Sequence, residues 1–302
     1  MRIAIVGGAG GVGASVAFNL LRMQDGHEVA IVDSRPNMVT SHVMDLEQTL
    51  LLGAGDGIKE GDDEDLATAD VVILAAAVPL TVNTSRMVYL EDNAAIVGGV
   101  LDRLDPGWDG VLLMVTNPVD PICTWARARS GIDRRRLVGY TINDSLRLRT
   151  GIAEALGADP REVDAWTIGE HGDGAVPLFD RVTVGGEPVE LSGPERAQAE
   201  EYLRGWYVKH VALDSGRSST WTSGVGVARM AVALGNDEGE LWPASVALEG
   251  EYGIDGIYLS VPVTIGRGGL REIHEWELGP AEREGMEAAA CTVREAAASI
   301  TA

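Results

Sequence analysis

The sequence contains little cysteine and no long apolar run. Its two cysteines, Cys123 and Cys291, are too few for a disulfide framework and lack the CxxC spacing of zinc or redox sites, so we expect two buried thiols and no metal site. No segment approaches the ~20 apolar residues that a membrane-spanning helix needs. The first apolar run, residues 3–6, lacks the basic start and long apolar centre of a signal peptide. These absences predict a cytoplasmic protein without a membrane partner.

Positive charge is also scarce. The 302 residues carry 24 Lys and Arg against 46 Asp and Glu, a formal net charge of −22, and Lys59 and Lys209 are the only lysines. Such a field repels phosphate backbones and anionic lipid surfaces, so nucleic acid is not an expected partner. The composition, 45% hydrophobic and 23% charged, is that of a folded globular protein. An anionic ligand would have to meet local arginines.

The first half of the chain alternates apolar runs with segments of helical spacing. The runs are residues 2–6, 28–33, 70–75 and 110–116. Continuous apolar strands separated by helices are typical of a parallel sheet that is covered on both faces. The acidic run at 60–65 is interpreted as a solvated turn that leads into a helix.

The second half mixes helices with alternating strands. The residue pattern predicts helices at residues 144–156, 195–211 and 280–299. Alternating apolar and polar residues predict strands at 181–184 and 258–265. The fold class predicted for the whole chain is therefore α/β. A doubly wound Rossmann domain at residues 1–143 is followed by a mixed α+β catalytic lobe at 144–302.

A glycine pattern follows the first predicted strand and opens a helix. Gly7, Gly10 and Gly13 form GxxGxxG, the context in which glycine serves a tight turn, close approach to a pyrophosphate and helix–strand packing. Asp33 ends the next strand, where a carboxylate would bind ribose hydroxyls and repel a 2′-phosphate. We therefore predict NAD rather than NADP as the cofactor, with Arg35 as the one feature that would suit NADP. The alternative is a glycine-rich turn that binds no nucleotide.

Three motifs and one arginine lie where a second set of functional residues is expected. They are TNPVD at 116–120, DSLR at 144–147, GEHGD at 169–173, and Arg86 in a loop after a strand. On these motifs the sequence resembles the malate/lactate dehydrogenase family over nearly its whole length. The GxxGxxG form and LEGEYG at 248–253 look more like the lactate-dehydrogenase-like malate dehydrogenases than the animal lactate dehydrogenases.

The resemblance implies an NAD-dependent oxidoreductase that acts on a 2-hydroxy or 2-keto acid. It also implies a homodimer or homotetramer, with helices near 38–52, 144–156 and 219–235 as candidate interfaces.

A histidine suits this chemistry because reduction of a 2-keto acid needs a proton donor at the ketone oxygen near neutral pH. His171, within GEHGD, is the candidate catalytic residue. Asp144 would accept a hydrogen bond from its other ring nitrogen, fix its tautomer and favour the imidazolium. The remaining histidines are interpreted as structural: His27, His42, His210 and His274.

Two arginines and an amide complete the predicted substrate site. Arg147 follows Asp144 by three residues, and its planar fork suits a carboxylate; the alternative is an ion pair with Asp144 or Asp173. The resemblance places Arg86 in a loop that closes over the substrate and polarises its carbonyl, and the alternative is a solvated arginine. Asn117 would hydrogen-bond the substrate oxygen or the nicotinamide amide.

Substrate selection is where the sequence departs from the family. Malate enzymes place an arginine, and lactate enzymes a glutamine, at the position of Leu80, and Arg86 is the only basic residue between Val78 and Leu90. A second carboxylate would then be buried without a cation. The family's other specificity positions are Ser219 and Ser223, which leave room without charge. We therefore predict a substrate with a neutral side chain, and the alternative is a genuine malate dehydrogenase with a cation placed elsewhere.

The approach to the DSLR helix also departs from the family. Residues 140–144 are one residue shorter than usual, and Asn143 stands where leucine is common. Two rival functions remain. An NAD-dependent glycosidase would need a Cys/His metal site, for which Cys123 is the one suitable thiol. A catalytically silent NAD-binding paralogue would have no physical reason to keep a general acid, its orienting carboxylate and two arginines.

Overall fold

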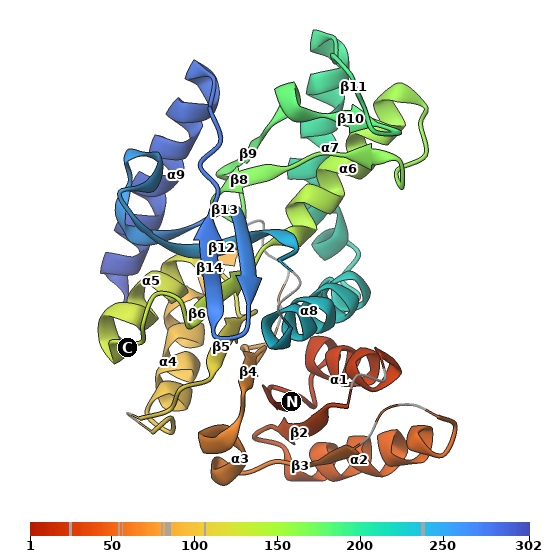
Figure 1. The fold of residues 1–302 in the computed structure, drawn as a ribbon, viewed down its shortest axis with the longest axis vertical. Helices are drawn as coiled ribbons and strands as arrows, with labels where there is room; N and C mark the ends of the chain where they lie inside the picture. Colours follow the sequence, from red (N-terminus) through yellow and green to blue (C-terminus); the bar gives the residue numbers. More distant parts are fainter. Residues whose placement is uncertain are drawn as a thin grey trace.

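One mixed sheet runs through the whole chain (Figure 1). The computed structural model describes residues 1–23, 26–53, 55, 57–79, 81, 86–105, 107–236 and 239–302. Within these residues the sheet has 11 strands in the order β3-β2-β1-β4-β5-β6-β12-β13-β8-β9, and β14 pairs with β13. A second sheet of three strands has the order β11-β10-β7.

The N-terminal half is a parallel sheet with helices on both faces. Its strands are β1 (Arg2–Val6), β2 (Glu28–Val32), β3 (Gly57–Glu60), β4 (Val71–Leu74), β5 (Val111–Met114) and β6 (Leu137–Tyr140). Its helices are α1 (Gly11–Met23), α2 (Pro36–Leu50), α3 (Asp63–Thr68), the short 3-10 helix η1 (Arg86–Tyr89), α4 (Leu90–Leu101) and α5 (Val119–Ser130). Every neighbouring pair from β3 to β6 is parallel. The Rossmann prediction is confirmed.

Alternating side chains of β1 fill two cores, one on each face of the sheet. Ile3 and Ile5 pack in the core that also contains α1 and α8 side chains, whereas Ala4 and Val6 pack in the core under α4 and α5. This arrangement explains why the strands are continuously apolar in sequence, because neither face meets water.

The C-terminal half contains four helices and eight strands among the described residues. The helices are α6 (Ile142–Leu156), α7 (Gly193–Ala212), α8 (Thr220–Gly235) and α9 (Pro280–Ser299), with the 3-10 turns η2 (Phe179–Arg181) and η3 (Glu251–Gly253). The strands are β7 (Val163–Asp164), β8 (Thr167–Gly169), β9 (Ala175–Pro177), β10 (Thr183–Val184), β11 (Glu187–Pro188), β12 (Leu241–Glu249), β13 (Asp255–Gly266) and β14 (Gly269–Ile273). The predicted mixed α+β lobe is confirmed.

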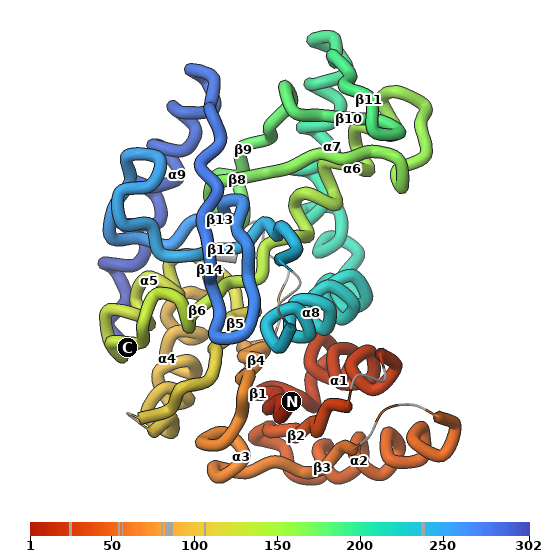
Figure 2. The backbone as a smooth tube through the Cα atoms, in the orientation of Figure 1, coloured from red at the N-terminus to blue at the C-terminus, as the bar shows by residue number. Residues whose placement is uncertain are grey.

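The two halves are joined by strand pairing and by a helix contact. β12 pairs antiparallel with β6, with Ser245 opposite Gly139. Helix α8 returns from the C-terminal half to pack on α1 (Figure 1). A Cβ on Gly224 would lie 1.9 Å from the Ser15 hydroxyl oxygen, so glycine permits this close approach. Figure 2 follows α9 alongside α5 to the C-terminus.

Several local predictions can be compared with the structure. The helix predicted at 280–299 is α9, and the acidic run leads into α3, where Asp62 accepts backbone hydrogen bonds in a capping box with Asp65. The predicted boundary between residues 143 and 144 falls in the first turn of α6. Cys123 is buried as predicted, but the prediction for Cys291 is wrong, because it lies on the outward face of α9. No helix of the described ranges is both long enough and apolar enough to cross a bilayer.

Candidate active site

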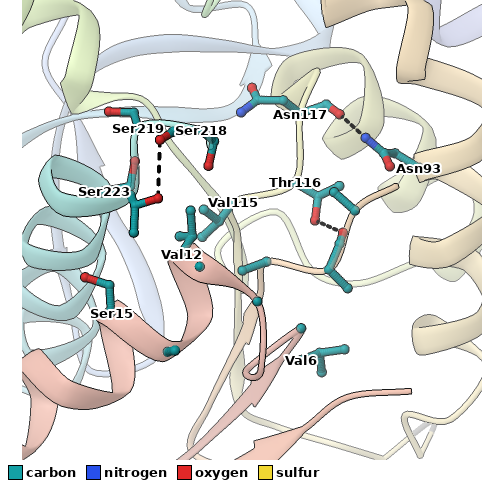
Figure 3. A pocket seen from close by; sticks show the side chains of 18 of the residues that line it. Val6, Val12, Ser15, Asn93, Val115, Thr116, Asn117, Ser218, Ser219 and Ser223 are labelled. Atoms are coloured by element: carbon teal, nitrogen blue, oxygen red, sulfur yellow. Dashed lines mark hydrogen bonds between the residues drawn. The ribbon is translucent and has the colours of Figure 1, made fainter. Parts of the chain in front are cut away.

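A cavity of about 1510 Å³ lies between the carboxyl ends of the parallel strands and the α7–α8 segment. One end is lined by the glycine turn after β1 and by Asp33, and the other by His171, Asn117, Ser219 and Ser223. Figure 3 shows Val12 and Ser15 of α1 beside Ser223 of α8, with Thr116 and Asn117 on the opposite side. The cavity therefore brings together residues that the sequence predicted for a cofactor and for a substrate.

Glycines Gly7 and Gly13 are required by close backbone contacts. Gly7 has a φ of +79°, and a Cβ on it would lie 2.5 Å from the Ala76 nitrogen. A Cβ on Gly13 would lie 2.3 Å from the Gly7 oxygen. Gly10 faces the cavity one residue before α1 begins, so a ligand can approach the first turn of that helix. Each of the three positions thus has its own physical reason to be glycine.

Asp33 lies at the cavity just beyond the end of β2. Its carboxylate accepts hydrogen bonds from the Ala9 backbone nitrogen at 3.2 Å and from Arg35 Nε at 2.9 Å. Burial raises the pKa of this carboxyl, but the hydrogen bonds and the positive charge of Arg35 outweigh it and hold the pKa below its usual value. Asp33 is therefore ionised at neutral pH, and the charge of Arg35 is offset by its own neighbour.

Three buried side chains form a hydrogen-bonded chain next to the other end of the cavity, where His171 is a lining residue and Asp144 and Arg147 are not. His171 Nδ1 lies 2.5 Å from Asp144 Oδ2, and Arg147 Nη1 donates to Asp144 Oδ1 at 2.8 Å. Their exposed fractions are 5% for His171, 4% for Asp144 and 7% for Arg147. The ion pair between Arg147 and Asp144, one of the readings of the sequence, is thus present. Asp144 joins the predicted proton donor to the predicted carboxylate-binding arginine.

The same histidine is held through its backbone by a carboxyl that the sequence analysis left without a role. Asp120 of the TNPVD motif accepts from the His171 backbone nitrogen at 2.6 Å and from the Ser245 hydroxyl at 2.5 Å. Burial raises the pKa of Asp120 to about 8, and both hydrogen bonds oppose that rise. Asp120 therefore couples His171 to strand β12, which is distant in sequence.

Asn117 presents its side-chain amide to the cavity. Its backbone oxygen accepts from Asn93 Nδ2 at 2.6 Å, and Figure 3 shows the side chain directed away from Asn93. The side-chain Oδ1 is buried and has no hydrogen-bond partner among the described residues. A buried amide oxygen without a donor is costly, so this atom fits a group that a ligand would supply.

The departure at Asn143 is explained by a polar network on the cavity wall. Tyr140 donates to Asn143 Oδ1 at 2.9 Å, and Asn143 Nδ2 donates to the Ser223 hydroxyl at 2.9 Å. A leucine at this position could make neither hydrogen bond. Ser219 is half-buried at the N-cap of α8, and its backbone oxygen accepts from the Ser223 nitrogen at 3.2 Å. Both predicted serines line the cavity.

Helix α7 and the segment after it add residues that the sequence analysis missed. Trp206, Tyr207, His210 and Arg217 line the cavity. Trp206 lies over Arg147, with 4.2 Å from the guanidinium carbon to the ring centroid. His210, interpreted as structural, stacks on Trp206 at a centroid distance of 4.8 Å. Helical spacing predicted α7, but which face would meet the cavity depends on packing against α6.

Two predicted residues, Leu80 and Arg86, lie wholly or partly outside the part of the chain that the structure describes. Leu80 lies outside the described residues. The backbone of Arg86 begins η1, and its side chain is outside the described part. Among the described residues, no group of three or more His, Cys, Asp or Glu side chains could hold a metal ion. Cys123, the thiol that a glycosidase would need, is fully buried.

The residues present fit a bound dinucleotide. The glycine turn leaves the start of α1 open, Asp33 is an ionised carboxylate at the end of β2, and Asn117 offers a buried oxygen to an amide donor. NAD, when bound, would supply the hydride or accept it.

Comparison with known proteins gives the family. Residues 1–139 match the NAD binding domain of lactate/malate dehydrogenases, and residues 141–302 match their alpha/beta C-terminal domain. The chain is 32% identical to L-lactate dehydrogenase 2 of Lactococcus lactis over 99% of this chain and 98% of the relative. It is 34% identical to the malate dehydrogenase of Halobacterium salinarum over 96% of each chain.

Solved structures agree with these matches. The malate dehydrogenase of Cryptosporidium parvum has a TM-score of 0.91 at 27% identity, covering 99% of this chain and 98% of its own. The minor L-lactate dehydrogenase of Enterococcus mundtii has a TM-score of 0.89 at 27% identity, with the same coverage. The chain belongs to the lactate/malate dehydrogenase family and is an NAD-dependent oxidoreductase that acts on 2-hydroxy and 2-keto acids.

Proposed function

We propose that His171 is the residue that exchanges the proton with the substrate. The observation that carries this proposal is the buried contact of 2.5 Å between His171 Nδ1 and Asp144 Oδ2 at the cavity wall. A carboxylate on Nδ1 fixes the ring tautomer and favours the protonated ring, so Nε2 is the atom that serves the substrate. In reduction, the ketone oxygen takes the proton from Nε2 and the ketone carbon takes the hydride, which leaves a 2-hydroxy acid and a neutral imidazole.

Arg147 and Arg86 have complementary roles in this proposal. Arg147 binds the substrate carboxylate through its planar fork, and its ion pair with Asp144 places it next to His171. Arg86, at the start of η1, polarises the ketone and stabilises the alkoxide that forms. Asn117 accepts a hydrogen bond at its Oδ1 from the nicotinamide amide, or donates to the substrate oxygen through its amide nitrogen.

The cofactor end is assigned to the pyrophosphate and the adenosine ribose. Gly7, Gly10 and Gly13 shape the turn in front of α1, whose unpaired backbone N–H groups face a phosphate. Asp33 binds the ribose hydroxyls and repels a 2′-phosphate, and the neutralisation of Arg35 by Asp33 supports NAD over NADP.

For the substrate itself we propose an uncharged side chain. The sequence places Leu80 where malate enzymes have arginine, and Ser219 and Ser223 give the cavity wall hydroxyl groups without charge. The hydroxyl of Ser223 already accepts from Asn143, so it is tied into the wall. Burying a second carboxylate against such a surface would cost several kcal/mol.

The experiment is NADH oxidation against a panel of 2-keto acids at matched cofactor concentration. The panel runs from oxaloacetate through pyruvate to branched and aromatic acids, with wild type beside Leu80→Arg. We expect wild type to prefer a neutral acid and Leu80→Arg to gain at least about tenfold in kcat/KM for oxaloacetate. Leu80→Gln is the matched control, since it adds a polar group without charge. A variant that gains no oxaloacetate activity would count against the role of Leu80.

A second candidate, a dicarboxylic substrate, is favoured by one specific observation. Arg217 lines the cavity, and among the described residues no carboxylate lies within ion-pair distance of it; its guanidinium carbon lies 5.7 Å from the Trp221 ring centroid. It could therefore serve as the distal cation. If oxaloacetate is the preferred substrate, Arg217→Gln should raise its KM about tenfold or more and leave that of pyruvate unchanged.

We also propose that the enzyme is a cytoplasmic homodimer or homotetramer. Helix α2 and the residues after it expose apolar side chains, with Met44 60%, Leu51 86% and Leu52 89% exposed. Such a stripe favours burial against a second copy. Sedimentation velocity tests the assembly: wild type should sediment as an oligomer, and Leu51→Glu together with Leu52→Glu should shift it toward monomer.

A further inference from the structure

We infer that Trp206 is a positioning and specificity-determining residue, which holds the Arg147 guanidinium and limits the size of the substrate side chain. The inference rests on the proposed role of Arg147 in binding the substrate carboxylate. Its first observation is the contact of 4.2 Å between the Arg147 guanidinium carbon and the centroid of the Trp206 ring. Trp206 also lines the cavity, whereas Arg147 is only 7% exposed.

The geometry of a guanidinium explains why this contact helps a carboxylate to bind. A guanidinium donates hydrogen bonds in its own plane and attracts an aromatic ring over its face. Stacking on Trp206 therefore does not compete with in-plane hydrogen bonds to Asp144 or to a substrate. The ring also removes water from one face of the cation, which strengthens its remaining electrostatic interactions. Arg147 is thus held by Asp144 at one edge and by Trp206 at one face.

Trp206 is itself fixed from its own helix. Its ring stacks on His210 at 4.8 Å with an interplanar angle of 11°. His210 Nε2 lies 3.0 Å from the Arg217 backbone oxygen, which ties the end of α7 to the segment before α8. The indole is therefore held in place on one side of the cavity. Its position depends on the connection between α7 and α8, which His210 contacts.

The same ring bounds the space for the substrate side chain. In a 2-keto acid the carboxylate and the side chain are both attached to the ketone carbon. If the carboxylate binds Arg147, the oxygen faces His171 and the hydride arrives from the cofactor side, then one direction is left for the side chain. We place that direction toward the part of the cavity wall that Trp206, Tyr207 and Ser219 line. Because Trp206 contacts Arg147, a large side chain would meet the indole within a few atoms of the carboxylate.

The test compares Trp206→Leu, Trp206→Phe and Trp206→Ala with wild type. Leucine keeps an apolar wall without a π face, phenylalanine keeps a smaller π face, and alanine opens the wall. The readouts are kcat and KM for pyruvate, the inhibition constant of oxamate, the affinity for NADH and the melting temperature. Oxamate, an isostere of pyruvate, reports on carboxylate binding without any chemical step.

For Trp206→Leu we expect KM for pyruvate and the inhibition constant of oxamate to rise about tenfold, with a smaller change in kcat and the same affinity for NADH. Trp206→Phe should recover part of the loss. Trp206→Ala should raise kcat/KM for 4-methyl-2-oxopentanoate and phenylpyruvate relative to pyruvate by about tenfold. Trp276→Leu is the matched control, because Trp276 contacts Arg181 at 4.5 Å in the same lobe and does not line the cavity.

The outcomes separate this inference from the proposed function. If wild type reduces a 2-keto acid and Trp206→Leu binds oxamate and pyruvate as tightly as wild type, the inference about Trp206 is wrong and the proposed function stands. An equal rise in KM for Trp276→Leu would also overturn it, since the effect would then come from general loosening of the lobe. If wild type reduces no member of the panel, the proposed function fails, and oxamate affinity still tests the contact with Arg147.

Discussion

The two ends of the cavity are built in different ways. The cofactor end comes from one short stretch of chain: Gly7 lies in the turn after β1, Gly13 in the first turn of α1 and Asp33 just beyond the end of β2. The substrate end is assembled from the β5–α5 connection, α6, the β8–β9 connection, α7 and α8. Local sequence is enough to specify the first end. The second depends on contacts between segments that are far apart in the chain.

The ion pairs at the two ends of the cavity also differ in how far solvent reaches them. Asp33 is paired with Arg35, whose side chain is 54% exposed, so solvent can replace part of the interaction. Asp144 is buried between His171 and Arg147, where water cannot compensate for a lost partner. Substitutions at the substrate end should therefore have larger effects on turnover than substitutions at the cofactor end.

The largest expected effect is the loss of turnover in His171→Asn. Asparagine keeps a polar group of similar reach but cannot deliver a proton near neutral pH. We expect kcat to fall about 10³-fold while the affinity for NADH, measured by fluorescence titration, stays within about twofold. Substantial turnover in this variant would mean that another group supplies the proton. A fall in NADH affinity of the same size would show that the two ends are not independent.

A smaller effect is expected at the cofactor end. Asp33→Ala removes the carboxylate that would bind ribose hydroxyls, and it frees Arg35 to meet a 2′-phosphate. The affinity for NADH should fall about tenfold and that for NADPH should rise, with the catalytic steps unchanged at saturating cofactor. Competitive titration of both nucleotides measures the ratio. Arg35→Gln is the control, since in the Asp33→Ala background it should reverse the gain in NADPH binding; an unchanged ratio of NADH to NADPH affinity in Asp33→Ala would refute this assignment.

The smallest effect concerns Asp120, the carboxyl behind His171. Its pKa is raised to about 8 in the folded protein from 3.8, chiefly by burial, so the folded state binds one proton more than the unfolded state between these values. The contribution of the Asp120 carboxyl to the free energy of unfolding is fully present below about pH 4, and it is lost as the pH rises toward 8. Asp120→Asn keeps an oxygen for the His171 backbone and lacks this titration.

Calorimetry from pH 6 to pH 9 measures the consequence for Asp120→Asn. The melting temperature of the variant relative to wild type should increase by a few degrees as pH rises to about 8, and should then stay constant. Asp255→Asn, at an exposed position, provides a control for the loss of one charge. A difference that does not vary with pH would show that Asp120 is ionised throughout the range.

The sequence predicted the features that local pattern encodes. The strand from residue 2 to 6, the turn after it and the helix from 280 to 299 have the boundaries that periodicity and proline position indicated. The contact predicted between His171 and Asp144 is present, and so is the ion pair of Arg147 with Asp144, which was the alternative interpretation of that arginine. The roles given to these residues stay predictions until the variants are measured.

The missed features share one physical cause. The role of Asp120 depends on strand β12 bringing Ser245 next to it, 125 residues later in the chain. Trp206 meets the cavity because of how α7 packs on α6, and a tryptophan in a predicted helix carries no signal of that direction. Cys291 was expected inside because thiols are usually buried, but α9 packs on the body of the protein with one face only. Long-range packing decided each of these positions.

The pairing of β6 with β12 has a mechanical consequence. Many two-lobed proteins close on a ligand by rotating one lobe about a flexible hinge. Here a shared sheet crosses the boundary, with Ala244 opposite Tyr140 and Ser245 opposite Gly139, so such a rotation would have to break backbone hydrogen bonds of the sheet. The pairing therefore opposes a hinge rotation between the lobes. Any adjustment of the enzyme around its substrate must come from segments outside the sheet.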